Sequence, residues 1–472
     1  MFGKTVKTLR QHLRRPLLAA VLAGATALPA HAESLADAMV AAYRHSALLD
    51  QNRAVLRAAD EDAASALAAL RPVLQWVASY TYQNIEGFDG NSRSLSLQAS
   101  MTLYDFGRSA IAIDIAKETV LATRAALVGV EQDVLLGAVN AYLDVRSATE
   151  QVDLQANSVR VIGQEQRAAT DRFDVGEITQ TDVSQADAAL AAARASLASA
   201  EGDLQIARET YRTVTGKLPG KLAPPPPSPK VPATLEQARD IARRTHPAIH
   251  ESQREAAAAE LGVAAAAAER NPELTGSASL NTSRSKSLSS FTGSAVHSSQ
   301  DVGQLNLQMS QTIYSGGRLP AAHRKAMAQR DAARAALLNI SRQVDQAVGT
   351  SWAGIDVARA QIRAIDEQIT AAQQAYNGVR EEATLGARTT LDVLDAEQSL
   401  LEARADKITA EANLQLAYYQ LLSAMGLLTV ENLKLGIPTY DPSAYYNAVQ
   451  DAPYTSRQGR SLDRVLHAIG KQ

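Results

Sequence analysis

The sequence predicts a mainly α-helical protein with membrane β-strands, built from two copies of one structural unit. Three observations predict this fold class. Matching positions recur at a nearly constant spacing, two segments have helical patterns far longer than those of a globular domain, and a short segment before each of them alternates apolar with polar residues.

Residues 1–32 have the pattern of a secretory signal peptide. Five basic side chains precede an apolar run from Leu17 to Leu28, and Ala30-His31-Ala32 supplies the small residues of a cleavage site. We therefore expect the mature chain to begin at Glu33. The apolar run is too short for a membrane anchor, because a spanning helix needs about 20 residues.

The composition argues against several classes of protein. The mature chain would carry 42 basic and 50 acidic side chains, a net charge of −8 that argues against a nucleic-acid partner. It contains no cysteine, so it can form no disulfide and carry no lipid on an amino-terminal cysteine. We expect no enzyme activity and no cofactor, because the sequence has no phosphate-binding GxxxxGK[ST] box and no grouped nucleophile, acid and base.

The chain is duplicated. Arg71-Pro72 recurs as Asn271-Pro272 at an offset of 200 residues, and Gly107-Arg108 recurs as Gly317-Arg318 at an offset of 210. Each copy reads as a helix, two strands, a long helix and a shorter helix. The expected segments are a signal peptide (1–32), a first repeat (33–216), a proline-rich linker (217–233), a second repeat (234–437) and a tail without an assigned role (438–472).

Long helices follow the strands in both copies, from about Arg108 to Asp174 and from about Arg318 to Thr384. Each would be on the order of 100 Å long. The shorter helices carry a seven-residue repeat with alanine at every second seam position, which is typical of closely packed coiled coils. We expect Lys407, the one charged residue in this seam, to extend to solvent. A soluble coiled-coil scaffold fits the helices equally well.

The strands discriminate between these alternatives. Between Pro72 and Arg108 apolar residues alternate with uncharged polar ones, and the second copy repeats the pattern. A soluble hairpin on a core has the same period, but aromatic residues on the apolar face and a serine-rich loop at 283–303 favour a membrane. Because four strands cannot close a barrel and lipid tolerates no open edge, such a chain would have to join with copies of itself.

The order of elements, with the doubled boxes VGEITQTDV (175–183) and LGARTTLDV (385–393), resembles the TolC family of outer-membrane export ducts. The resemblance covers the mature chain from Ser34 to about Leu428. It implies that three chains close a twelve-stranded β-barrel whose polar faces line the pore, and that their helices continue as an α-helical tunnel through the periplasm.

The doubled box also has a structural explanation. Gly176 and Gly386 would end the long helices as left-handed hinge residues. Each is followed by a Thr-x-x-Asp capping box that opens the next helix, in which Asp182 and Asp392 are the aspartates. Asp395 needs another explanation, since its counterpart in the first copy is Gln185.

The resemblance gives these boxes a second role at the periplasmic tip. It implies that Arg388 pairs with Thr181 and Asp182 to hold the entrance shut, and that Asp392 and Asp395 form rings of negative charge that select cations and raise each other's pKa. A gate tyrosine of the family is replaced here by Ala383. We therefore expect the latch to depend more on Arg388.

The leading hypothesis is a passive outer-membrane channel of a tripartite export system that extends into the periplasm. The stretch 385–406 resembles the type I protein secretion branch, although drug efflux also fits. The implied partners are two further copies of the chain, outer-membrane lipid, a periplasmic adaptor and an inner-membrane ABC or proton-driven transporter. The alternative is a soluble periplasmic scaffold or adaptor. A metal site at His246 and His250 is not favoured, because Pro247 interrupts the pair.

Overall fold

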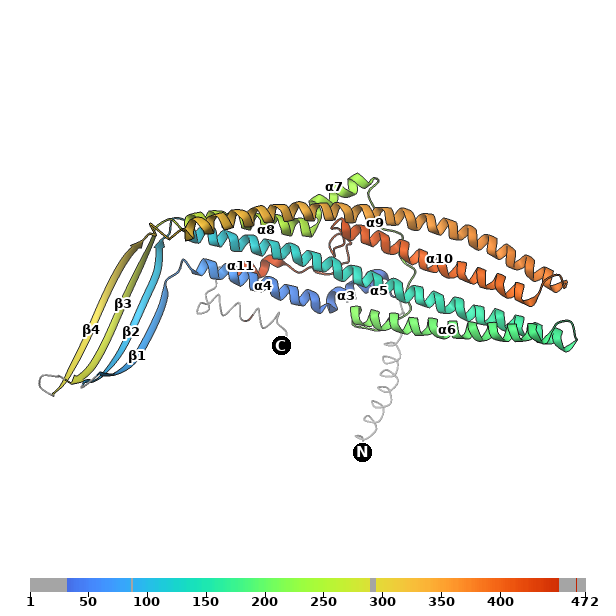
Figure 1. Ribbon diagram of the computed structural model, residues 1–472, viewed down its shortest axis with the longest axis horizontal. Coiled ribbons are helices and arrows are strands. Elements are labelled where there is room, and N and C mark those ends of the chain that lie inside the picture. The colour runs from blue at the N-terminus through green and yellow to red at the C-terminus, as the bar shows by residue number, and fades with distance from the viewer. Residues whose placement is uncertain (1–31, 86–87, 289–293, 450–463, 465–472) are drawn as a thin grey trace, which may run out of the picture.

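The computed structural model describes residues 32–85, 88–288, 294–449 and 464, so the predicted signal peptide and most of the tail beyond Val449 lie outside the described residues. A four-stranded sheet occupies one end of an elongated molecule, and long helices run from it to the other end (Figure 1). No helix in the described part of the chain is both long and apolar enough to cross a membrane.

The two halves of the chain contain the same succession of elements. The first half holds α3 (Leu35–His45), α4 (Ala47–Ala68), β1 (Val73–Ile85), β2 (Phe88–Tyr104), α5 (Arg108–Asp174) and α6 (Gln180–Thr215). The second half holds α7 (Leu235–Thr245), α8 (Pro247–Ala268), β3 (Glu273–Leu288), β4 (Ala295–Ser310), α9 (Arg318–Thr384) and α10 (Thr390–Ala424). The long helices end where the sequence predicts.

The prediction of a single helix before each pair of strands is wrong. Two consecutive helices stand in its place in both halves. In the first half Ser46 ends α3 in an extended conformation, and its hydroxyl caps α4 by accepting from the Leu49 N–H. In the second half His246 occupies this place, because the residue before Pro247 cannot continue a helix. Two different residues therefore produce the same break.

The long and short helices of each half form an antiparallel hairpin (Figure 1). The alanine-rich seam is the buried side of these hairpins, with Ala186 and Ala403 completely inaccessible to solvent. The prediction that Lys407 extends to solvent without a partner is wrong. Its ammonium Nζ lies 2.7 Å from a carboxylate oxygen of Asp366 on α9, so the charge joins the two helices of the second hairpin.

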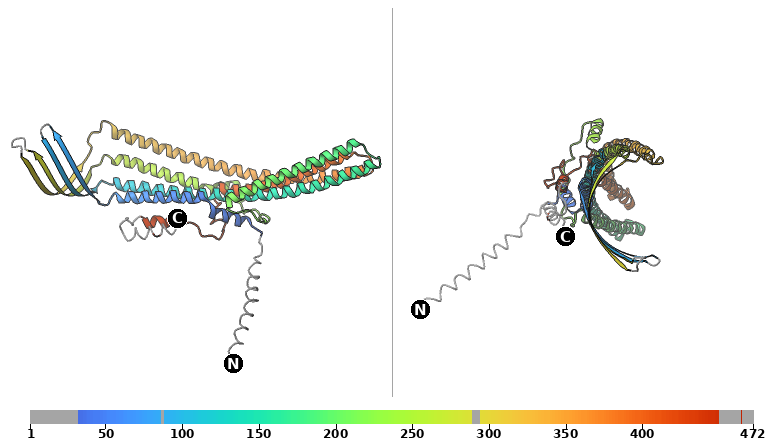
Figure 2. Two further views of the ribbon diagram at one scale, coloured as in Figure 1. Left: turned by 90° about the horizontal axis from the view of Figure 1, so that it is seen from below. Right: turned by 90° about the vertical axis from the view of Figure 1, so that its left-hand side faces the viewer.

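The sheet is antiparallel in the order β1-β2-β3-β4, and it is strongly curved (Figure 2). Strands β2 and β3 pair along their length, with Leu97 opposite Leu280, and this pairing joins the two halves into one sheet. The loop expected at 283–303 is mostly strand, because the alternation continues through its serines and β3 pairs with β4 as far as Leu288 and Ala295.

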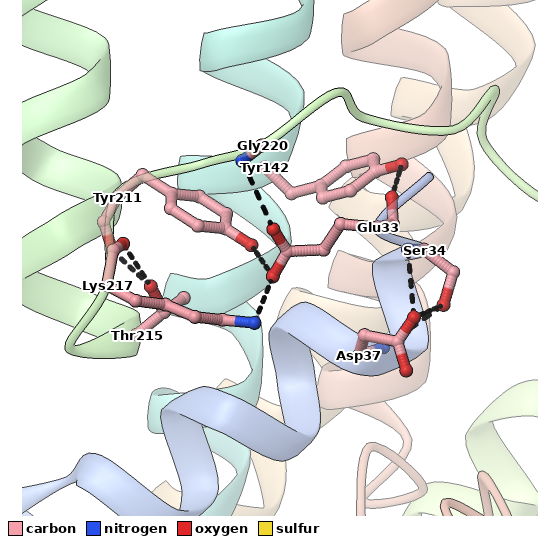
Figure 3. A network of polar contacts seen from close by, with 8 residues as sticks. All are labelled: Glu33, Ser34, Asp37, Tyr142, Tyr211, Thr215, Lys217 and Gly220. Carbon is pink, nitrogen blue, oxygen red and sulfur yellow. Dashed lines mark hydrogen bonds and ion pairs between the residues drawn. The ribbon is translucent and has the colours of Figure 1, made fainter. Parts of the chain in front are cut away.

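The main core lies at mid-length, where helices from both halves meet. Glu33 fixes the start of the described chain to this region by a parallel bridge with Leu222 of the linker. The Glu33 carboxylate accepts from the hydroxyl of Tyr211 and the ammonium of Lys217, both at 2.8 Å, and its carbonyl oxygen accepts from the Tyr142 hydroxyl at 3.2 Å (Figure 3). The linker is thus held against α5 and α6.

The described part of the tail contains a helix of its own, α11 (Pro442–Val449), which packs against α4 in the first half. The Tyr445 hydroxyl donates to a carboxylate oxygen of Glu61 at 2.7 Å. The guanidinium of Arg124 stacks on the ring of Tyr446, with its carbon 5.3 Å from the ring centre. The tail therefore has a structural contact that the duplication does not predict.

Candidate gate at the helical tip

The end of the molecule opposite the sheet is formed by two helix-to-helix turns, one in each half (Figure 1). Gly176 and Gly386 adopt φ values of 80° and 77°, in the left-handed region that other residues disfavour. In the first turn the Gly176 N–H donates to the Phe173 carbonyl and the Glu177 N–H donates to the Arg172 carbonyl. This Schellman pattern, repeated at Gly386, ends both long helices.

Capping boxes open the next helix at both turns, as the sequence predicts. A carboxylate oxygen of Asp182 accepts from the Thr179 N–H at 2.9 Å, and Asp392 accepts from the Thr389 N–H at the same distance. Hydrogen bonds from the two threonines lower the pKa of both aspartates, so both carboxylates stay ionised at neutral pH. The capping role does not exclude a second role in transport.

Arg388 lies in the second turn, where its exposed guanidinium Nε is 2.9 Å from a carboxylate oxygen of Glu382. This contact raises the pKa of Arg388. Within one chain, therefore, the structure does not bring Arg388 together with Thr181 and Asp182 of the other turn. Thr181 is exposed in the first turn of α6.

Asp395 is exposed on α10, one helical turn after Asp392. Its side chain has no capping role, since the box at this turn uses Asp392 alone. Two carboxylates therefore stand on successive turns at the start of α10, whereas α6 presents Asp182 and the neutral Gln185. The two tips therefore differ in where their carboxylates stand on the helix that follows the turn.

Comparisons with known proteins decide what this architecture is. The family model described as "Outer membrane efflux protein" matches residues 39–217 and 238–427, which are most of both halves. The chain belongs to the outer membrane efflux protein family. It is 34% identical over 439 residues to the outer membrane efflux protein BepC of Brucella suis biovar 1, covering 92% of this chain and 94% of BepC.

Other efflux family members agree with this result. The chain is 26% identical to the outer membrane protein TolC of Escherichia coli K12 over 432 residues, which cover 86% of each chain. A crystal structure of CusC superimposes with a TM-score of 0.74 at 21% identity and covers 84% of this chain and 92% of CusC, which shows the same fold. As an efflux family member, the protein is an outer-membrane channel that extends into the periplasm and transports rather than catalyses.

Sequence reasoning missed one contact of this efflux channel near the tip. Arg380 on α9 lies 3.5 Å from a carboxylate oxygen of Glu165 on α5, so an ion pair joins the two helical hairpins. It borders a cavity of about 250 Å³ that is also lined by Arg172 and Thr390. The two opposite charges can be read from the sequence, but the heptad pattern does not indicate that α5 and α9 meet at this point.

A buried carboxylate accompanies this ion pair. Glu397 on α10 is 8% exposed, and burial raises its pKa. The hydroxyl of Tyr376 on α9 is its hydrogen-bond partner. This contact lies within the second hairpin, beside the Arg380–Glu165 ion pair that joins the two hairpins.

His246 and His250, at the start of α8, both contact backbone atoms. The His246 ring accepts from the Ala248 N–H at 3.2 Å, and the His250 ring lies 2.8 Å from the Arg244 carbonyl oxygen. Among the residues that the structure describes, no group of three His, Cys, Asp or Glu side chains could hold a metal ion.

Proposed function

We propose that three copies of this chain form one export duct whose helical tip is its gate, and that it works with a periplasmic adaptor and an inner-membrane ABC or proton-driven transporter. The observation that carries the proposal is the four-stranded sheet with unpaired outer edges on β1 and β4. In lipid such edges have no water to bond, so they must pair with other strands, and three chains would supply twelve.

The proposed cargo class is a secreted protein, in a type I system, with small-molecule efflux as the second candidate. The resemblance of residues 385–406 to the secretion branch supports the first, and the likeness to a protein named for efflux, BepC, supports the second. Deleting the gene and measuring both secreted proteins and drug susceptibility separates the two: a loss of secretion with unchanged susceptibility favours the first.

At the tip, we propose that Asp392 and Asp395 of the three chains form two rings of negative charge facing the pore. Divalent and trivalent cations would bind such rings and block the current. Asp392→Asn combined with Asp395→Asn should weaken the block by a polyvalent cation about tenfold or more in planar-bilayer conductance. The control is Glu201→Gln combined with Asp203→Asn, which removes two exposed carboxylates from α6 away from the turn and should keep the block. Equal block in all three proteins would contradict the assignment.

We propose that Arg388 is the latch and that Gly176 and Gly386 are the hinge points of the turns. On closing, Arg388 would exchange Glu382 for Thr181 and Asp182 of an adjacent hairpin. Arg388→Ala should then raise the resting conductance, because no gate tyrosine stands at Ala383 to hold the tip. Lys325→Ala, which removes an exposed cation from α9 far from the tip, is the control. An unchanged resting conductance in Arg388→Ala would rule out the latch.

A further inference from the structure

The sheet has one apolar face, which the strand register defines. Residues that lie opposite each other across an antiparallel pair share a face. One such row contains Leu74, Ala99, Ala278 and Leu305, and the next row on this face contains Trp76, Leu97 and Leu280. Apart from the half-buried Ala99, these side chains are exposed in the single chain, for example 71% for Trp76 and 78% for Leu305.

Basic side chains continue the same face toward the strand tips. Two rows beyond Trp76, the register places Tyr80, Arg93, Arg284 and Ser299 side by side. The following row on this face adds Tyr82, Asn91, Lys286 and His297. Arg93, Arg284 and Lys286 are all exposed, and these three side chains form a cationic rim.

The cationic rim brings like charges close together. Arg93 and Arg284 are direct cross-strand partners, and Lys286 follows Arg284 by two residues on the same face. Like charges opposite each other destabilise a sheet. Arg93 stacks on the ring of Tyr80, 5.6 Å away, but no ion pair joins Arg284 or Lys286 to a carboxylate within the part of the chain that the structure describes. Asp301, one row nearer the apolar belt, is the acidic residue that shares this face on β4.

The rim lies where hydrocarbon gives way to lipid headgroups. The strand tips are at the end of the molecule farthest from the helical tip (Figure 1), so in a channel that extends into the periplasm they lie on the outer side of the membrane. Tyr80 and Tyr82 sit within the cationic rows, and tyrosine is enriched at this interface in outer-membrane barrels. A ligand here must combine apolar chains with an anionic head.

We propose that Arg93, Arg284 and Lys286 bind the phosphate groups of a phosphorylated glycolipid in the outer leaflet. Guanidinium groups bind phosphate through paired hydrogen bonds, and the ammonium of Lys286 adds a point charge. The acyl chains of the same lipid would cover the rows of Trp76 and Leu74. This binding site rests on the proposed closure of the sheet into a membrane barrel, since only then does the apolar face contact lipid.

The test uses the mature protein in phosphatidylcholine vesicles that contain a chelator and dansyl-labelled bisphosphoryl lipid A. Trp76 lies on the same face as the rim, so energy transfer from it to dansyl reports binding, with Trp352→Phe in every protein to remove the second tryptophan. The variant is Arg93→Gln, Arg284→Gln and Lys286→Gln. The matched control removes three exposed cations from α9 instead, by Lys325→Gln, Arg342→Gln and Arg363→Gln.

The rim variant should need about 100-fold more labelled lipid for half-maximal energy transfer, since each basic residue near an anionic headgroup contributes about a factor of five. The α9 control should match the parent protein, and dephosphorylated lipid A should bind every protein alike and weakly. Equal binding of the two lipids, or an unchanged rim variant, would overturn the inference. Conductance in phosphatidylcholine bilayers is measured in parallel: a parent protein that forms no channel contradicts the proposed function, whereas a conducting parent without lipid preference contradicts only the lipid site.

Discussion

Equivalent ion pairs in the two repeats have opposite environments. Asp60 on α4 and Arg124 on α5 correspond to Glu260 on α8 and Arg334 on α9. Asp60 is completely buried 3.9 Å from Arg124, whereas Glu260 and Arg334 form an exposed pair. The difference is the tail, because α11 and Tyr440 cover α4 while α8 has no such cover from the described tail. A segment outside the duplication thus changes the chemistry of a duplicated contact.

The buried carboxylate, Asp60, should make the free energy of unfolding depend on pH. Burial raises the pKa of Asp60 from 3.8 to about 6, with Arg124 opposing the shift and Glu61 adding to it. Neither carboxylate oxygen has a hydrogen-bond partner among the described residues. Since the folded chain binds this proton more tightly than the unfolded chain, the contribution of Asp60 to the free energy of unfolding is most favourable below about pH 4 and falls as the pH rises to about 6.

The largest effect is expected for Asp60→Asn, which removes the buried carboxylate that distinguishes the first repeat from the second. It should remove a pH-dependent loss of about 3 kcal/mol in the free energy of unfolding between pH 4 and pH 7. Urea titrations of the detergent-solubilised protein across this range measure it. Glu260→Gln, the equivalent change in the second repeat, should leave the pH dependence of the parent intact, and a parent-like slope in Asp60→Asn would show that the pair is not buried in solution.

The two helix-to-helix turns provide the opposite case, because their backbone conformation is the same in both repeats. A methyl group added at Gly176 or Gly386 would meet no other described atom within 4 Å, so only the left-handed backbone opposes a side chain. Gly176→Ala and Gly386→Ala should each lower the free energy of unfolding by about 1 to 2 kcal/mol. Gly202→Ala inside α6 should instead raise it by up to about 1 kcal/mol. The same urea titrations measure all three, and clearly unequal losses at the two turns would show that they are not equivalent.

The smallest expected effect concerns the tail itself. Tyr445→Phe removes the hydrogen bond to Glu61 and should lower the free energy of unfolding by about 1 kcal/mol. Tyr446→Phe keeps the ring under Arg124 and should change it by less than about 0.5 kcal/mol. Urea titration at neutral pH compares the two variants. If both behave like the parent, α11 does not stay on α4 in solution.

Local patterns in the sequence were sufficient to predict the helices and strands of the fold. The period of seven near Ala186 predicts the hairpins, the period of two near Trp76 predicts the strands, and Thr179 and Thr389 predict the caps. These patterns depend on neighbours within one or two turns, which residue order alone places side by side.

Contacts between distant segments could not be predicted in this way. The burial of Asp60 depends on residues nearly 400 positions later, and its own neighbours Glu61 and Asp62 suggest a solvated face. The ion pair of Glu165 with Arg380 depends on how two hairpins cross. At the candidate gate, the caps were predictable, but the contact of Arg388 with Glu382 was not, because a flexible arginine has several acids within reach.

The equal lengths of the long helices constrain how such a protein can change over time. Helices α5 and α9 both contain 67 residues, and their turns lie level with each other at the tip (Figure 1). Inserting residues into one helix alone would displace its turn by about 1.5 Å per residue and leave the mouth uneven. Lengthening the duct to suit a wider periplasm therefore requires matched insertions in both halves of the gene.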